Sequence, residues 1–61
     1  MSESYEIAVE HVRWMRKKAY RMNEISMIAN LACHQAGLTY VPIRNLEDAH
    51  QAFACAHEVT R

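Results

Sequence analysis

The first 36 residues contain no glycine and no proline, so no residue in this stretch obliges a helix to stop. The only glycine is Gly37 and the only proline is Pro42. Apolar side chains recur at three- and four-residue spacing, as in a helix that packs against other helices. This seam consists of Tyr5, Ala8, Val12, Met15, Ala19 and Met22. We therefore expect an all-α fold whose first helix covers about 4–36 and ends at a left-handed cap on Gly37.

The segment after Gly37 predicts a turn and then a second helix. Residues 38–44 are rich in β-branched and aromatic side chains and include Pro42; since one strand cannot form a sheet, we expect an extended connector. Asn45 is a suitable N-cap, and Glu47 and Asp48 follow where carboxylates suit the helix dipole. The second helix is therefore expected at about 46–60, within a single domain that spans 1–61.

A continuous first helix would have two apolar faces. At 100° per residue, a second apolar group lies roughly opposite the seam; its members are Ile7, Trp14, Ile25, Ile28 and Ala32. The first helix would be about 50 Å long, against about 22 Å for the second helix. A helical hairpin that dimerises into a four-helix arrangement would cover both faces, and we favour it because no glycine or proline enforces a break. The alternative is a break near Asn23, with a new helix from Glu24 and a three-helix bundle. The residues expected in the core or the self-association surface are Ile7, Ile25, Ile28, Tyr5, Val12, Met15 and Met22.

Size and charge exclude several classes of protein. A chain of 61 residues buries only about 60% of its unfolded surface, so its stability is expected to be marginal. Two cysteines are too few for a disulfide scaffold, and the start MSESYE lacks the features of a signal peptide, which favours the cytoplasm. No apolar stretch approaches the roughly 20 residues that span a bilayer, so no membrane partner is expected. The formal net charge is zero, so no overall field attracts nucleic acid.

The densest group of cations is the candidate binding site. Five basic residues fall within nine positions, interleaved with Trp14 and Tyr20. Tryptophan and arginine are enriched in protein-binding hot spots, whereas a basic stripe with aromatic side chains also suits nucleic acid. A solvated helix face that also carries Glu10 and Glu24 is the alternative without a function, and Trp14 could equally serve the core or a self-interface. The partner-binding candidates are Trp14, Lys17, Lys18 and Arg21, followed by Arg13.

Metal binding and catalysis are not expected. The possible zinc ligands are Cys33, His34, His50, Cys55 and His57. They form no C-x-x-C or H-x-x-x-H pattern, and His50 and His57 would lie about 10 Å apart along a helix. A cysteine with a nearby histidine is the only conceivable nucleophile pair, and a helical chain of this size scarcely encloses a substrate. We therefore expect a protein without a cofactor or enzymatic activity.

The opening SESYEIAVEHVRWMRKKAYRM, the single Gly37 and the ending NLEDAHQAFACAHEVTR resemble the small early proteins of lambdoid bacteriophages encoded between the exonuclease and excisionase genes. The resemblance lies in size and helical character over the whole chain, and it transfers no functional residue. It implies a non-enzymatic protein that binds a host or phage protein and influences host replication, the cell cycle or the choice between lysis and lysogeny. A homodimer is expected, and binding of nucleic acid by the basic stripe is the alternative function.

Overall fold

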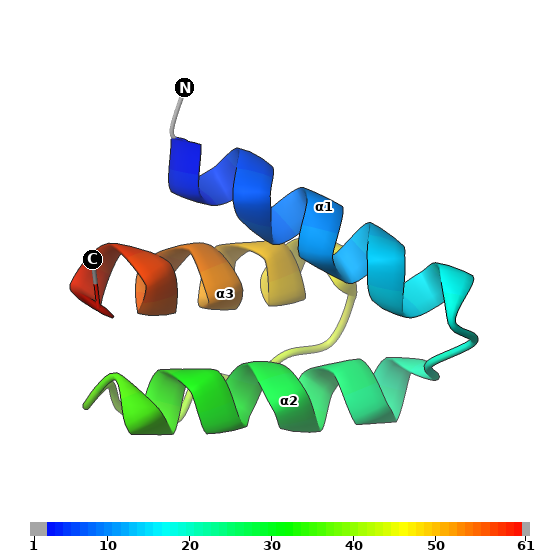
Figure 1. The fold of residues 1–61 in the computed structure, drawn as a ribbon. Helices are drawn as coiled ribbons and strands as arrows, with labels where there is room; N and C mark the ends of the chain where they lie inside the picture. Colours follow the sequence, from blue (N-terminus) through cyan, green and yellow to red (C-terminus); the bar gives the residue numbers. More distant parts are fainter. Residues whose placement is uncertain (1–2, 61) are drawn as a thin grey trace.

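The computed structural model describes residues 3–60, and within them the chain forms three helices and no strand: α1 (Glu3–Lys17), α2 (Met22–Gln35) and α3 (Leu46–Thr60) (Figure 1). The expected all-α fold is confirmed. The expected two-helix hairpin is wrong, because the first helix of about 4–36 is divided into α1 and α2. The alternative break near Asn23 is closer, although α2 begins at Met22.

The break between α1 and α2 is a left-handed helix cap built on an alanine. Ala19 has φ 67°, and two hydrogen bonds close the turn: Tyr20 N donates to the Met15 carbonyl at 3.0 Å, and Ala19 N to the Arg16 carbonyl at 3.0 Å. This pair of bonds defines a Schellman motif, in which glycine normally occupies the left-handed position. A break at Ala19 was not predicted, because alanine ordinarily does not occupy a left-handed position.

The end of α2 has the same motif with the expected glycine. Gly37 has φ 80°, Leu38 N donates to the Cys33 carbonyl at 2.9 Å, and Gly37 N to the His34 carbonyl at 3.0 Å. In both motifs the residue after the left-handed position, Tyr20 or Leu38, packs partly buried against the core. An apolar residue at this position is the one sequence signal that the two breaks share.

Each later helix begins with a side-chain cap. The Arg21 backbone N–H donates to the Glu24 carboxylate at 2.7 Å, which satisfies a free donor at the start of α2. At the start of α3, the Asp48 backbone N–H donates to Asn45 Oδ1 at 2.8 Å. The predicted cap at Asn45 and the predicted range of the last helix agree with the structure. The connector before it contains no strand, as expected.

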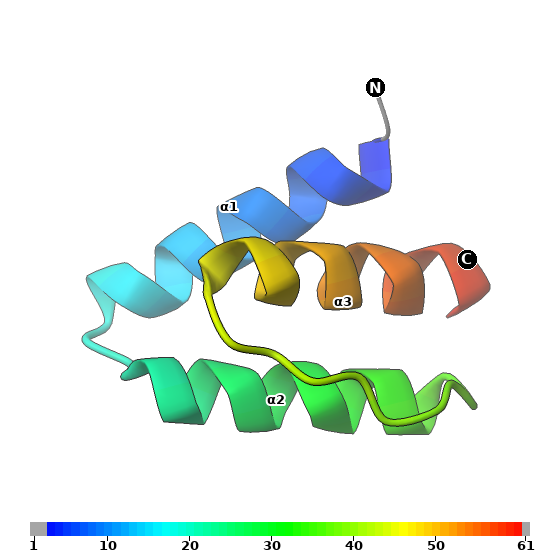
Figure 2. The same ribbon diagram turned by 180° about the vertical axis from the view of Figure 1, so that it is seen from behind.

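The last helix lies between the other two. α1 and α2 each pack along α3 and scarcely contact one another, so the helices form a flat layer with extents of 28 × 24 × 15 Å (Figure 1). The connector between α2 and α3 crosses one face of this layer (Figure 2). Small side chains let two helices approach one helix from different sides, and α3 supplies four buried alanines. These are Ala49, Ala52, Ala54 and Ala56.

The core takes one stripe from each outer helix. Ala8, Val12 and Met15 of α1 and Ile25, Ala29 and Cys33 of α2 are each at most 2% exposed. The second apolar group therefore does not form a single helix face. Ile25 is fully buried, Ile28 is half-buried, and Ile7 and Trp14 are exposed. Burying a side chain such as Ile25 contributes about 1.5–3 kcal/mol, which offsets the roughly 1–2 kcal/mol cost of a left-handed alanine. Tyr5 and Met22 lie half-buried at the margin of this core.

Candidate functional site

A pocket of about 360 Å³ opens between α1 and α2, and its lining includes no residue of the connector. Because α1 and α2 scarcely touch, α3 forms its floor and the two outer helices form its walls. We call this pocket the open groove. Its lining residues are Ile7, Ala8 and His11 of α1, Ile28, Leu31, Ala32 and Gln35 of α2, and Phe53, Ala56, His57 and Thr60 of α3.

Large apolar side chains remain exposed on the walls of the open groove. Ile7 is 44% exposed and Leu31 is 55% exposed, and they face the groove from opposite helices. The His11 ring covers the Phe53 ring on the floor, with centroids 4.8 Å apart. Exposed apolar groups gathered around a concavity mark an interaction surface rather than scattered exposure. Leu31, Phe53 and His57 were not predicted, because only the folded chain brings α2 and α3 to this face.

The predicted partner-binding residues divide into two groups. Trp14 is 51% exposed on the same side of α1 as Ile7, and Lys18 Nζ lies 5.8 Å from its ring. The centroid of the Tyr20 ring lies 6.3 Å from that of the Trp14 ring. The turn after α1 therefore carries two neighbouring aromatic rings, with the Lys18 ammonium over the Trp14 ring. Lys17 and Arg21 are exposed near this turn.

Arg13 belongs to the opposite side of α1. Its guanidinium pairs with the Glu10 carboxylate at 2.9 Å, and its side chain borders a hollow with Val9 and His50, away from the open groove. The structure thus brings Trp14 and Lys18 together and separates Arg13 from them.

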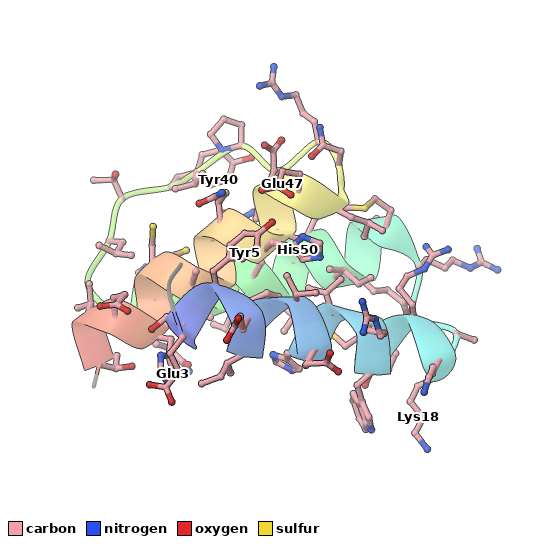
Figure 3. The ribbon with its side chains drawn as sticks, turned by 90° about the horizontal axis from the view of Figure 1, so that it is seen from above. Glu3, Tyr5, Lys18, Tyr40, Glu47 and His50 are labelled. Atoms are coloured by element: carbon pink, nitrogen blue, oxygen red, sulfur yellow. The ribbon has the colours of Figure 1, made fainter. Side chains whose placement is uncertain are left out.

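A polar cluster on the other side of α1 links α1 to the start of α3. The Tyr5 hydroxyl donates to both oxygens of the Glu47 carboxylate at 2.9 and 3.0 Å, and His50 Nδ1 lies 3.5 Å from the same group (Figure 3). Hydrogen bonds from Gln51 and from Tyr5 lower the pKa of Glu47, whereas the same carboxylate raises the pKa of Tyr5. The Glu47 carboxylate thus accepts hydrogen bonds from Tyr5 of α1 and from Gln51 of α3, which is typical of a structural tie between helices.

Within residues 3–60, a grouping of Ser4 of α1 with His57 and Glu58 of α3 resembles a catalytic triad. Ser4 Oγ lies 2.7 Å from His57 Nδ1 and donates to the Glu58 carboxylate. In a nucleophilic triad the serine gives its proton to the histidine, whereas here that proton is directed to the carboxylate. The Ser4 side chain is also fully buried. The arrangement therefore ties the start of α1 to the end of α3 and presents no accessible nucleophile.

The cysteines and histidines offer no metal centre within residues 3–60, where no group of three potential ligands gathers. Cys33 is buried, and its thiol donates to the Ala52 carbonyl at 3.5 Å, whereas Cys55 is exposed. Burial raises the pKa of the Cys33 thiol, and the nearby Cys55 adds to this shift. In the same part of the chain, every helix is too short or too polar to cross a bilayer.

A larger hollow of about 760 Å³ lies beside α2, where the exposed Met27 and Tyr40 form part of its lining. One of its walls is the irregular start of the connector. The open groove has helical walls on both sides and a helical floor, and a site on helices holds its side chains more rigidly than one on a loop. We therefore regard the open groove as the candidate site.

Comparisons of this chain with protein-family models, with curated proteins and with solved structures found no match.

Proposed function

We propose that this protein is a non-enzymatic protein-interaction module that receives a helix of another protein chain in its open groove. The observation that carries this proposal is the exposed pair of Ile7 and Leu31, which face one another across a floor that contains Phe53. An amphipathic helix commonly binds such a groove by placing an apolar stripe between two helical walls. Burial of the groove side chains supplies the driving force.

The cation-bearing turn after α1 extends the site at one end. Lys18 and Arg21 are exposed there, and Lys18 lies against the Trp14 ring. Acidic side chains on the incoming chain would therefore increase the association rate and fix its direction. The resemblance to early phage proteins suggests a host or phage protein as the partner, in the cytoplasm of an infected bacterium. On this proposal the partner's role in replication, the cell cycle or the lysis–lysogeny choice is modulated by occupancy of the groove.

The test introduces lysine at two equally exposed apolar positions, one inside the open groove and one outside it. Leu31 on the groove wall and Val59 on the outer surface of α3 are both 55% exposed, so lysine at either position should leave the fold intact. We expect tagged wild-type protein and Val59→Lys to retain the same bound protein, and Leu31→Lys to lose it while its helical circular dichroism is unchanged. Equal binding by both variants, or a wild type that binds neither another protein nor a second copy of itself through the groove, would refute the proposal.

A second candidate function is supported by the aromatic pair of Trp14 and Tyr20 with Lys18 at the turn after α1. Nucleic-acid bases stack on such side chains while cations contact phosphates. This reading requires steep salt dependence, with log affinity falling by roughly 0.9 per unit of log salt for each duplex phosphate contacted. A gel-shift assay at low salt that shows no complex would eliminate it.

A further inference from the structure

We propose that the occupant of the open groove is Trp14 of a second copy of this chain, with the two α1 helices packed antiparallel about a twofold axis. This inference rests on the proposed function in using the open groove as a binding site for a helix, and it names a second copy of this chain as the occupant in place of a host or phage protein. Three observations on α1 and the open groove point to a second copy. They are the order of charges along one stripe, the exposure of Trp14 and the position of the groove along the helix.

The exposed stripe of α1 has a defined composition and direction. Positions 3, 7, 11, 14 and 18 follow helical spacing and therefore share one side of α1, next to the open groove. Glu3 and Lys18 project from the same side of α1, away from the connector that carries Tyr40 (Figure 3). The stripe begins with an acid, ends with a base and has Ile7 and Trp14 between them.

This stripe is complementary to itself when one copy is reversed. Antiparallel packing centred between residues 10 and 11 brings together positions whose numbers sum to 21. Glu3 then faces the second copy's Lys18, and Ile7 faces the second copy's Trp14. At the centre, Glu10 meets the second copy's His11. A twofold axis repeats each contact, as an isologous interface requires. Parallel packing would instead oppose Glu3 to Glu3 and Lys18 to Lys18, which is unfavourable.

The open groove lies where the reversed helix delivers its tryptophan. The start of α1 and the ends of α2 and α3 lie at the same end of the molecule (Figure 1), and Ile7, Leu31 and His57 line the groove there. The position opposite Ile7 belongs to the second copy's Trp14. A pocket of about 360 Å³ accepts an indole ring, and the floor beneath it includes Phe53. A buried tryptophan in a pocket is the usual anchor of an interface.

The size of the molecule is consistent with this arrangement. The helix layer measures 28 × 24 Å across its faces, and a stable interface buries about 800 Å² on each partner. One face of the layer, grooved between α1 and α2, can supply most of that area. Chains of this length also commonly depend on association for stability.

Trp14 is the only tryptophan, so its fluorescence reports directly on the interface. We expect a mass near twice 7.1 kDa by sedimentation equilibrium, and a tryptophan emission that shifts to the red as the protein is diluted and the dimer dissociates. Trp14→Ala should weaken dimerisation at least about thirtyfold, with the helical circular dichroism retained because the side chain is half exposed in one copy. A wild-type protein that stays monomeric up to about 0.5 mM, where even weak dimers associate, overturns the inference.

Charge exchange tests the antiparallel register itself. In the antiparallel dimer, Lys18→Glu places its carboxylate opposite the second copy's Glu3, and the twofold axis repeats this repulsion. The dissociation constant of the dimer should therefore rise about tenfold. The double variant Glu3→Lys with Lys18→Glu restores opposite charges and should restore the dimer to near the wild-type affinity. Arg16→Glu makes the same change from base to acid at an exposed position on the opposite side of α1 and should leave the affinity unchanged. A double variant no tighter than Lys18→Glu overturns the register.

Failure of this inference is distinguishable from failure of the proposed function. If the wild type is monomeric but binds another protein in a manner lost in Leu31→Lys and kept in Val59→Lys, the second copy is refuted and the interaction module stands. If the wild type neither dimerises nor binds another protein through the groove, both are refuted. A dimer that survives both Trp14→Ala and Leu31→Lys uses another surface and refutes the role assigned to the open groove.

Discussion

Replacing Ala19 by glycine removes one methyl group. Whether the free energy of unfolding rises or falls depends on whether the helix breaks at this residue or continues through it. In the structure Ala19 is left-handed, with φ 67°, which costs an L-residue about 1–2 kcal/mol relative to a favoured conformation. Glycine removes that strain but loses about 0.5–1 kcal/mol through the greater freedom of its unfolded chain. We therefore expect Ala19→Gly to raise the free energy of unfolding by about 0.5–1 kcal/mol.

Urea denaturation followed by circular dichroism measures this change, at one fixed protein concentration because association would add to the apparent stability. The melting temperature should rise by roughly 2–8 °C for a domain of this size. Gly37→Ala is the matched control, since Gly37 occupies the same position of the same motif with φ 80° and has open space around it. That substitution should destabilise the protein by about 1 kcal/mol.

A continuous helix over 4–36 requires the opposite result for Ala19. Glycine in a helix interior costs about 1 kcal/mol relative to alanine, so Ala19→Gly would then lower the stability. A loss of that size, with Gly37→Ala behaving as expected, would refute the break between α1 and α2.

Three further predictions follow from burial and hydrogen bonding. Ile25→Ala should lower the free energy of unfolding by about 2–5 kcal/mol in urea denaturation, because the side chain is fully buried; a loss below 1 kcal/mol would contradict its place in the core. NMR titration should place the pKa of the Glu47 carboxyl below the ordinary glutamate value, and Tyr5→Phe should raise that pKa. Because the pKa is lowered in the folded state, the contribution of Glu47 to stability is present above its unfolded pKa and is lost as the pH falls through its folded pKa. Acid unfolding that is identical in the wild type and in Tyr5→Phe would contradict the link between α1 and α3. Iodoacetamide should modify the exposed Cys55 well before the buried Cys33, whose thiol pKa is raised, and mass spectrometry of the labelled peptides would reveal the reverse order if the assignment is wrong.

Local signals in the sequence were sufficient for the second half of the fold. Gly37 identifies the end of α2, and Asn45 with Asp48 identifies the start of α3, because caps depend on a few neighbouring residues. The break at Ala19 has the same geometry as that at Gly37 but lacks the glycine. Only the apolar Tyr20, in the position equivalent to Leu38, hints at it.

The candidate site was predictable only in part. Trp14 and Lys18 are four residues apart on one helix, so their proximity follows from helical spacing. The contribution of Phe53 and Leu31 could not be predicted, since these residues belong to helices whose relative placement is not a local property. Arg13 was grouped with the cations by sequence distance alone, and its pairing with Glu10 separates it from the site.

The sequence by itself determined that the chain is helical and that apolar stripes must be covered, because helical spacing follows from backbone geometry and side-chain chemistry alone. The tertiary structure decided which stripes cover one another. An alanine-rich α3 lets α1 and α2 approach from two sides, and burial of Ile25 offsets the strain of a left-handed Ala19. With α3 in the middle, α1 and α2 make few contacts with one another, and the open groove lies between them.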